Sequence, residues 1–128
     1  MAYYNSKIVD SSFETTIDRV TEELKKEGFG VLTEIDVKET LKKKLNVDFR
    51  KYKILGACNP SFAHKALQTE PNIGVLLPCN IIVQETAEGK VDVAAVNPME
   101  SMQAVNNPSL GEVASEVTAR LSKVLNNL

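Results

Sequence analysis

"GVLLPCNIIVQE", residues 74–85, is a nearly unbroken apolar run of a length typical of a buried strand. The turn residues "TAEGK", 86–90, separate it from "VDVAAV", 91–96, which we interpret as its hairpin partner. Pro78 interrupts the first run. Because proline has no amide hydrogen for the ladder, we expect a bulge or a change of strand partner there. The stretch therefore predicts an antiparallel hairpin with an irregularity in its first strand.

Two long amphipathic helices are expected on either side of this hairpin in the chain. Apolar residues recur at helical spacing over 12–27 and over 108–127. Further strands are expected at 3–10, 29–35 and 50–57, and short helices at 37–45 and from 60 to before Pro71. Consecutive strands with helices outside them predict an α+β fold. We expect a single domain, residues 1–128, in which an antiparallel sheet of four to five strands is backed by the two main helices.

The composition is that of a globular domain. Hydrophobic residues make up 43% and charged residues 25% of the 128 residues, which argues against disorder. The first ten residues lack the features of a signal peptide, and no apolar run approaches the roughly 20 residues that span a bilayer. We therefore expect a cytoplasmic protein without membrane segments. In that compartment the two cysteines are expected to be free thiols, metal ligands or packing residues rather than a disulfide.

Residues 41–53, "LKKKLNVDFRKYK", carry a local positive excess. This stretch contains six basic side chains and one acidic side chain, although the whole chain has a net charge of -2. A nucleic-acid surface would need aromatic rings placed to stack on bases, and this stretch offers only Phe49 and Tyr52. We interpret it as a solvated helix end and strand edge, and nucleic-acid binding is not expected.

Two Cys-Asn pairs, in "GACNP" at 56–60 and "LPCN" at 77–80, mark the candidate site. Cys58 directly precedes the helix expected at Pro60, where free amides and the helix dipole lower the pKa of a thiol. Cys79 lies among apolar strand residues, which raise a thiol pKa. Each cysteine can also be a small buried packing residue.

The two asparagines of these pairs have different explanations. Asn-Pro is typical of a helix start, with Asn as the cap and Pro in the first turn, and it occurs at 59–60, 97–98 and 107–108. Asn59 is accounted for as such a cap. Asn80 stands inside an apolar strand, where an amide without partners costs roughly 1–3 kcal/mol. Asn80 therefore either binds backbone at the irregularity near Pro78 or faces a ligand pocket.

Sulfur and imidazole side chains near these pairs suggest a soft metal ion. His64 lies about one turn into the helix that follows Cys58, and the thioethers of Met99 and Met102 follow the last strand. Thiolate, thioether and imidazole ligands suit Cu(I). Cys58, Cys79 and either His64 or Met102 are therefore candidate metal ligands, although no short Cys-x-x-Cys or His-x-x-x-His spacing fixes two of them together.

Three stretches carry a resemblance to a known family: "YKILGACNPSFAHKAL" (52–67), "GVLLPCNIIVQETAEGKVDV" (74–93) and "NPMESM" (97–102). They resemble the bacterial and archaeal family catalogued as domain of unknown function 302, over nearly the whole chain. The resemblance implies a strongly bent antiparallel sheet backed by helices, similar to the TATA-binding-protein-like arrangement and often assembled as a homodimer. It supplies no established activity. Its pattern maps onto Gly56, Cys58, Asn59, Pro60, Pro78, Cys79, Asn80, Pro98 and Met102.

These residues favour a binding protein over an acid–base enzyme. His64 lacks an obvious acidic partner in sequence, and no serine stands in a nucleophile elbow. We expect a pocket for a small molecule or a soft metal ion. Its expected lining is Cys58, Asn59, Cys79, Asn80, His64 and Met102. The alternative is a thiol-based enzyme or redox sensor that uses Cys58.

A homodimer is expected from the number of apolar faces. The two long helices can cover only one face of the sheet. Apolar residues also point to the other face, namely Leu76 and Ile82 in one strand and Ala94 and Val96 in the next. Monomers rarely leave such a patch in water. Either a second copy covers it, as we expect, or the two short helices fold over it within one chain.

Overall fold

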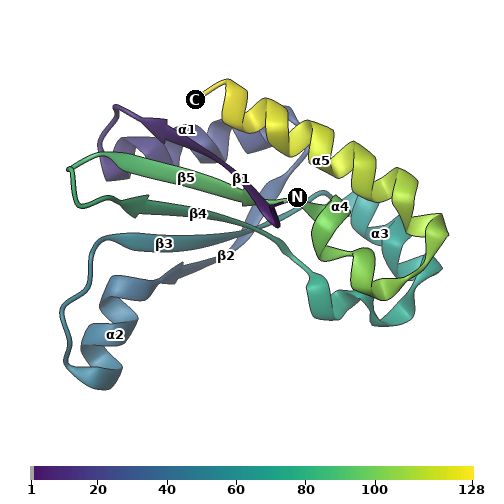
Figure 1. The fold of residues 1–128 in the computed structure, drawn as a ribbon, viewed down its shortest axis with the longest axis horizontal. Coiled ribbons are helices and arrows are strands. Elements are labelled where there is room, and N and C mark those ends of the chain that lie inside the picture. Colours follow the sequence, from purple (N-terminus) through teal and green to yellow (C-terminus); the bar gives the residue numbers. More distant parts are fainter. Residues whose placement is uncertain (1) are drawn as a thin grey trace.

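The structure is a computed structural model that describes residues 2–128, and it consists of a sheet with helices packed against it (Figure 1). Within these residues, five antiparallel strands form one open sheet in the order β1-β5-β4-β3-β2. The strands are β1 (Tyr4–Val9), β2 (Gly30–Asp36), β3 (Tyr52–Cys58), β4 (Cys79–Glu85) and β5 (Val91–Val96). The helices are α1 (Phe13–Lys26), α2 (Val37–Leu45), α3 (Pro60–Thr69), α4 (Pro98–Ser101) and α5 (Gly111–Asn126), and the 3-10 helices are η1 (Pro71–Leu76), η2 (Gln103–Val105) and η3 (Pro108–Leu110). The predicted α+β class with an antiparallel sheet is confirmed.

Side-chain caps fix the starts of three helices close to their expected positions. Ser12 caps α1, and Asp36 caps α2 by accepting a hydrogen bond from the Glu39 amide at 2.9 Å. Asn59 caps α3. These oxygens satisfy amides that have no partner inside the helix. None of the helices in the described part of the chain is long and apolar enough to cross a bilayer.

The strand expected over 74–85 is wrong in its first part. Residues Pro71–Leu76 form η1, and β4 begins at Cys79, directly after Pro78. Pro78 has no amide hydrogen to donate to the ladder. It therefore lies directly before β4 and does not form a bulge within a longer continuous strand. Leu76 therefore does not lie on a face of the sheet.

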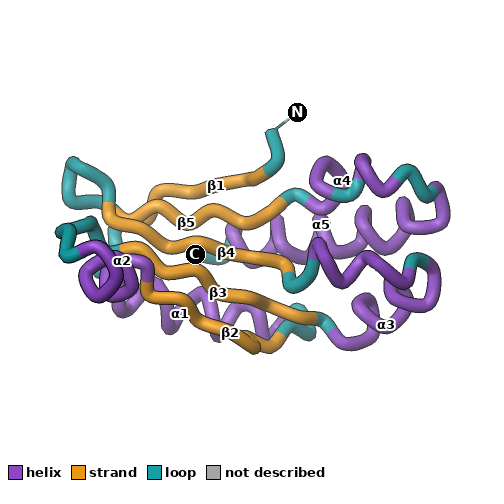
Figure 2. Tube along the Cα trace, turned by 90° about the horizontal axis from the view of Figure 1, so that it is seen from below, coloured by secondary structure: helices purple, strands orange, loops and turns teal. Residues whose placement is uncertain are grey.

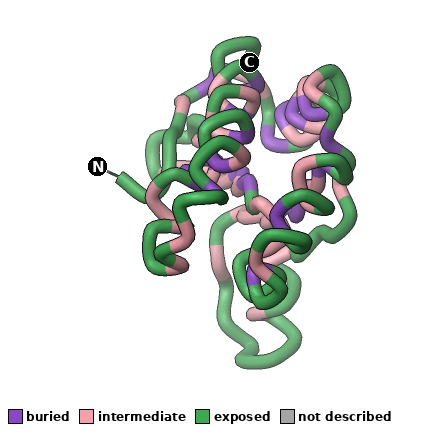
Figure 3. Tube along the Cα trace, turned by 90° about the vertical axis from the view of Figure 1, so that its right-hand side faces the viewer, coloured by how far each residue is buried: buried purple, intermediate pink, exposed green. Residues whose placement is uncertain are grey.

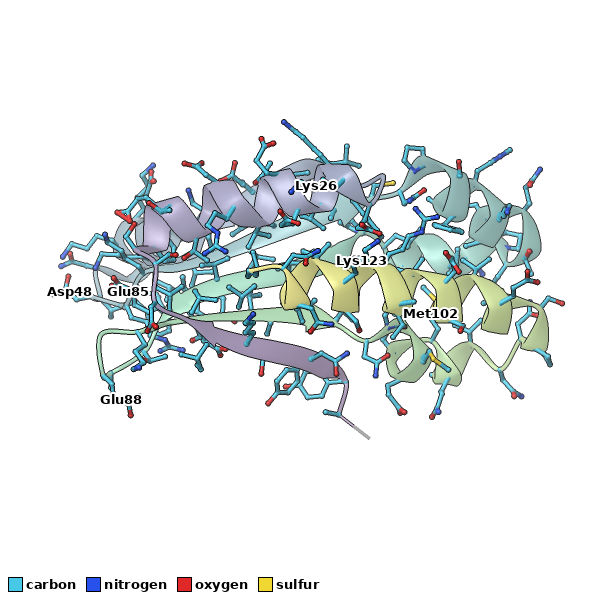
Figure 4. The ribbon with its side chains drawn as sticks, turned by 90° about the horizontal axis from the view of Figure 1, so that it is seen from above. Lys26, Asp48, Glu85, Glu88, Met102 and Lys123 are labelled. Atoms are coloured by element: carbon cyan, nitrogen blue, oxygen red, sulfur yellow. The ribbon has the colours of Figure 1, made fainter. Side chains whose placement is uncertain are left out.

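Helices α1 and α5 lie side by side over one face of the sheet and form the main core with it (Figure 4). Val20 and Leu24 of α1 and Leu121 of α5 are at most 2% exposed. They pack in one cluster with strand residues on the same face of the sheet, which include Leu55, Ile81, Val83 and Val93. Burial of each such side chain is worth about 1.5–3 kcal/mol. The two main helices expected from periodicity are therefore the ones that hold the sheet.

A second, smaller cluster forms beyond the end of the sheet. There α5 overhangs the strands, and α3, α4 and η1 pack beneath it (Figure 1). Ala66, Ile73 and Leu110 are its buried members, and Met102 and Val113 pack against them. The chain thus has two apolar clusters, and the candidate site lies where they meet.

We predict that Gly56→Ala destabilises the fold by about 1–3 kcal/mol, as expected for overpacking. A Cβ at residue 56 would lie 2.7 Å from Cγ of Pro78 and would also overlap Oγ1 of Thr33. The proline ring is rigid and cannot move without shifting the start of β4. Urea denaturation measures the free energy of unfolding. Gly30→Ala in β2 is the matched control, because nothing lies within 4 Å of its added Cβ. Equal stability of the two variants would contradict the close packing of Gly56 on Pro78.

Candidate functional site

An apolar pocket of about 280 Å³ lies where the main core meets the smaller cluster. Both cysteines line it. The main core contributes Phe29, Ala57 and Val117 to its wall, and the smaller cluster contributes Ala66, Leu77, Met102 and Val113. Two separately packed clusters therefore leave a space between them, and this space contains the Cys-Asn segments.

The antiparallel pairing of β3 and β4 brings the two cysteines to this place. Strand β3 ends at Cys58 and β4 begins at Cys79, so the two positions meet at the same end of the sheet. Ala57 is the register partner of Cys79, which makes Cys58 and Cys79 near neighbours across the ladder. Both are half-buried free thiols. Residues that are 21 positions apart in the sequence thus line one pocket.

The environment of Cys79 makes its thiol hard to ionise. Burial, with a smaller contribution from the neighbouring Cys58, raises the pKa of the Cys79 thiol to about 11. The expectation that apolar neighbours raise this pKa is confirmed. At neutral pH Cys79 is therefore a small apolar wall residue with a weak hydrogen-bond donor.

Asn59 lines the pocket, but its side chain holds secondary-structure elements together. Its Oδ1 accepts from the Phe62 amide at 3.5 Å, which is the predicted cap, and its Nδ2 donates to the carbonyl of Glu27 at 3.3 Å. The same carbonyl accepts from Nη1 of Arg120 at 3.0 Å. Asn59 thus ties the end of α1 to the start of α3, and Arg120 adds α5 to the same junction.

The rim and one wall of the pocket contain residues that the sequence analysis missed. The ladder between β2 and β3 is irregular between Val31 and Thr33, and the intervening Leu32 lines the pocket although it is 69% exposed. A β-bulge changes the direction of a side chain in this way. No residue type in β2 indicates a bulge at Leu32 in the sequence. Phe62 forms part of the wall together with Ala66, and the i, i+4 spacing of these two residues could have indicated a common helix face.

The remaining candidate residues divide between the pocket and other surfaces. Met102 lines the pocket with Cys58 and Cys79. His64 is exposed on α3, and Asn80 is exposed on the opposite face of the sheet, where it lines a separate hollow. In residues 2–128 no group of three or more His, Cys, Asp and Glu side chains could hold a metal ion. The structure thus brings together Cys58, Asn59, Cys79 and Met102, and it places His64 and Asn80 elsewhere.

Comparison with known proteins identifies one family model, one solved structure and one further relative that are similar to this chain. The family model described as "Domain of unknown function DUF302" matches residues 5–128. The crystal structure of an uncharacterized conserved protein DUF302 from Bacillus stearothermophilus is 32% identical, with a TM-score of 0.92 and coverage of 98% of each chain. An uncharacterized protein from Aquifex aeolicus (strain VF5) is 42% identical over 40 residues, which is 31% of this chain. The matched segment spans 28% of that protein.

We predict that Cys79 is alkylated slowly at neutral pH and that its rate rises toward pH 11. With a pKa of about 11, about one molecule in a thousand carries the thiolate at pH 8, whereas an ordinary thiol is about a quarter ionised. The Cys58→Ser variant leaves Cys79 as the reporting thiol, and mass spectrometry follows its reaction with iodoacetamide. The same variant unfolded in urea is the control and should titrate near the ordinary value. A folded-state midpoint near pH 8.5 would contradict the burial of this thiol.

Proposed function

This chain belongs to the DUF302 family of domains of unknown function, and we propose that it is a binding protein whose pocket holds a small uncharged molecule. The observation that carries the proposal is the apolar pocket at the junction of the two clusters. Protein interiors are otherwise close-packed, with few voids larger than a water molecule. A concave apolar space with a few polar groups is the usual form of a small-molecule site.

The size of the pocket limits the ligand. A cavity of about 150 Å³ holds a benzene molecule. A volume of about 280 Å³ therefore suits a molecule of about ten to twelve non-hydrogen atoms. Ring systems and short branched chains of this size meet the requirement.

The lining also limits the charge of the ligand. Among the described residues that form the pocket, none carries a charged side chain. The polar atoms available to a ligand include the two thiols and the hydroxyl of Thr33, because Asn59 already has backbone partners on its amide. A charged ligand would lose its hydration without gaining a partner. The site therefore favours a neutral molecule with at most weak hydrogen-bonding groups.

We predict that indole, an uncharged probe of suitable size, binds the pocket and that Ala63→Met weakens binding at least about tenfold. Ala63 lines the pocket from α3, so a methionine there fills the space. The chain contains no tryptophan, and the blue shift of indole fluorescence can therefore be followed directly.

Ser61→Met is the matched control, because Ser61 is exposed on the same helix and does not line the pocket. It should bind indole like the unmodified protein. Unchanged binding by Ala63→Met, or an equal loss in both variants, would contradict the proposed site. Native mass spectrometry of the purified protein is the direct way to identify a resident ligand.

A soft metal ion is the second candidate ligand, and the common position of three sulfur-bearing side chains supports it. Cys58, Cys79 and Met102 line one pocket, and thiolate and thioether ligands select Cu(I). Because the pKa of Cys79 is raised to about 11, its thiol is protonated at neutral pH. Metal binding would therefore have to displace this proton.

For this candidate we predict that the protein retains Cu(I) through desalting, whereas the Cys58→Ser, Cys79→Ser double variant loses it. Met102→Leu should lower retention. Met99→Leu is the matched control, since Met99 is 47% exposed and does not line the pocket. Elemental analysis after gel filtration measures the metal content. Equal copper in the unmodified protein and the double variant would exclude these sulfurs as the ligands.

Thiol chemistry at Cys58 is the alternative function. Cys58 stands directly before the capped start of α3, and a helix start favours the thiolate. Alkylation of the Cys79→Ser variant across pH separates the two functions. An apparent pKa well below about 8.5 would favour a thiol enzyme or redox sensor, and an ordinary thiol would favour binding alone.

Two further parts of the proposal come from the resemblance and the composition. We propose that the sheet has the bend of the TATA-binding-protein-like arrangement, which an open antiparallel sheet with helices packed against it supports. We also propose a cytoplasmic location, where the thiols of Cys58 and Cys79 would stay reduced.

A further inference from the structure

One face of the sheet has no helix layer of its own. Seen from this side, the strands face the viewer and α1 and α5 lie behind them (Figure 2). Helix α2 packs against β2 and β3, and α3 packs against η1 and α5. The segment that contains α2 projects below the sheet in Figure 1 and forms the exposed lower part of Figure 3. Cover by the short helices, one of the two alternatives considered for this face, is therefore not what the structure shows.

A hollow of about 460 Å³ lies on this uncovered face. It is the hollow that Asn80 lines, and it is separate from the pocket that contains the two cysteines. We name it the sheet hollow. Its lining includes three tyrosines, two amides, one carboxylate and several apolar side chains, namely Tyr3, Tyr4, Tyr52, Asn80, Gln84, Asp92, Ile82, Ala94 and Val96. A concave space with aromatic walls and a few convergent polar groups is the usual form of a small-molecule site.

The strand registers divide the sheet hollow into three rows. The first row is polar and aromatic and consists of register partners in β3, β4 and β5, namely Tyr52, Gln84 and Asp92. The middle row is apolar and consists of Ile82 and Ala94. The last row has an amide, an apolar side chain and a phenol, namely Asn80, Val96 and Tyr4. The first and last rows lie roughly 13 Å apart, because they are four residues apart on β5 and a strand rises about 3.4 Å per residue.

Asp92 is the charged residue in the lining of the sheet hollow. Its side chain is half-buried, and burial raises the pKa of its carboxyl. Within residues 2–128 no hydrogen bond or ion pair offsets this burial. Removing a carboxylate from water without a partner costs free energy, and a positive group beside it would stabilise the charged form. The first row therefore favours a cation.

The basic side chains near the first row have other partners. Nε of Arg50 donates to Oε1 of Gln84 at 2.9 Å. Three lysines near the row pair with acidic residues, namely Lys90 with Asp10, Lys51 with Glu14 and Lys53 with Glu34. The Asp92 carboxylate is therefore available to a cation that the chain itself does not supply.

Tyrosine rings lie at both ends of the sheet hollow. Tyr52 belongs to the first row, and Tyr3 and Tyr4 lie at the other end with their ring centres 4.9 Å apart. Tyr3 is 72% exposed and Tyr4 is 41% exposed. Aromatic rings attract cations over their faces and offer flat apolar area, while the phenol hydroxyl can form a hydrogen bond. Such walls suit a cation that has a flat apolar body.

We propose that the sheet hollow binds a small organic ammonium ion, whose positive group pairs with Asp92 and whose apolar body lies over Ile82 and Ala94. The small side chain of Ala94 leaves room for this body between the two outer rows. At the far end, Asn80 and Tyr4 can each donate and accept a hydrogen bond, so they suit a hydroxyl group. The ligand class is therefore an amine whose ammonium and hydroxyl groups are separated by a flat apolar body.

This inference goes beyond the binding of a neutral molecule in the pocket between the two clusters. That pocket has no charged side chain in its described lining, whereas the sheet hollow has Asp92. The two sites therefore differ in the charge of the ligand that they favour. Ala63→Met fills the pocket between the clusters and leaves the sheet hollow unchanged, so titrations of this variant report the sheet hollow alone.

Tyramine is a suitable probe, because its ammonium and phenol groups lie on opposite sides of one aromatic ring. Tyrosol is the matched neutral probe, since a hydroxyl replaces the ammonium. We predict that Ala63→Met binds tyramine as the unmodified protein does, and that it binds tyrosol at least about tenfold more weakly than tyramine. Isothermal titration calorimetry measures both dissociation constants.

Asp92→Asn, made in the Ala63→Met protein, should raise the dissociation constant for tyramine at least about tenfold. The amide has nearly the size of the carboxylate but no charge, so tyrosol binding should not change. Asp18→Asn is the matched control, because Asp18 is exposed on α1 and does not line the sheet hollow. This variant should keep the full affinity for tyramine.

Four outcomes would overturn the proposal. They are the absence of tyramine binding at millimolar concentration, equal affinity for tyramine and tyrosol in Ala63→Met, loss of tyramine binding in Ala63→Met, and unchanged tyramine binding by Asp92→Asn. The comparison of the two probes needs no change at Asp92, so it tests the role of charge even if Asp92→Asn does not fold. If tyramine does not bind and sedimentation equilibrium gives twice the chain mass of 14.1 kDa, a second copy is the occupant of this face instead.

Discussion

Burial of one face of the sheet by α1 and α5 is the interaction on which the rest of the structure depends. The two helices supply one apolar side each, and together they cover the face that contains Leu55, Ile81 and Val93. Since α5 overhangs the ends of the strands (Figure 1), its first turns lack a strand beneath them. The smaller cluster of α3, η1 and η3 residues fills that space. The pocket and the uncovered second face of the sheet are both consequences of this one-sided layer.

The pocket follows from the way the chain enters and leaves the smaller cluster. Strand β3 runs into α3, and η1 returns to β4, so one excursion of the chain begins at Cys58 and ends at Cys79. Asn59 fixes the start of the excursion through its cap and its bond to the carbonyl of Glu27. Pro78 stands at its end, close to Gly56. The two cysteines are therefore near neighbours, because the excursion starts and ends on neighbouring strands.

Local signals in the sequence predicted much of the fold and less of the site. Caps such as Ser12 and Asn59 bind amides within three residues, so the helix starts are visible in the sequence. The apolar run before Pro78 is typical of a strand by composition, but Val75 and Leu76 lie in the 3-10 helix η1 and are 85% and 40% exposed, so composition alone predicts the wrong element. Leu32 reaches the pocket through a bulge that depends on pairing with β3. Contacts of that kind are set by the tertiary fold and leave no local pattern.

The pocket and the face of the sheet that α1 and α5 leave uncovered differ in shape and charge. The pocket is concave and lacks charged lining residues among those described, which is the form of a site for a neutral molecule. The uncovered face carries Asp92, and the basic helix α2 packs beside it against β2 and β3. Alternation along β4 separates the two, since Cys79 lines the pocket and Asn80 lines the hollow on the other face. A side chain on one face can therefore be changed without direct contact with the other face.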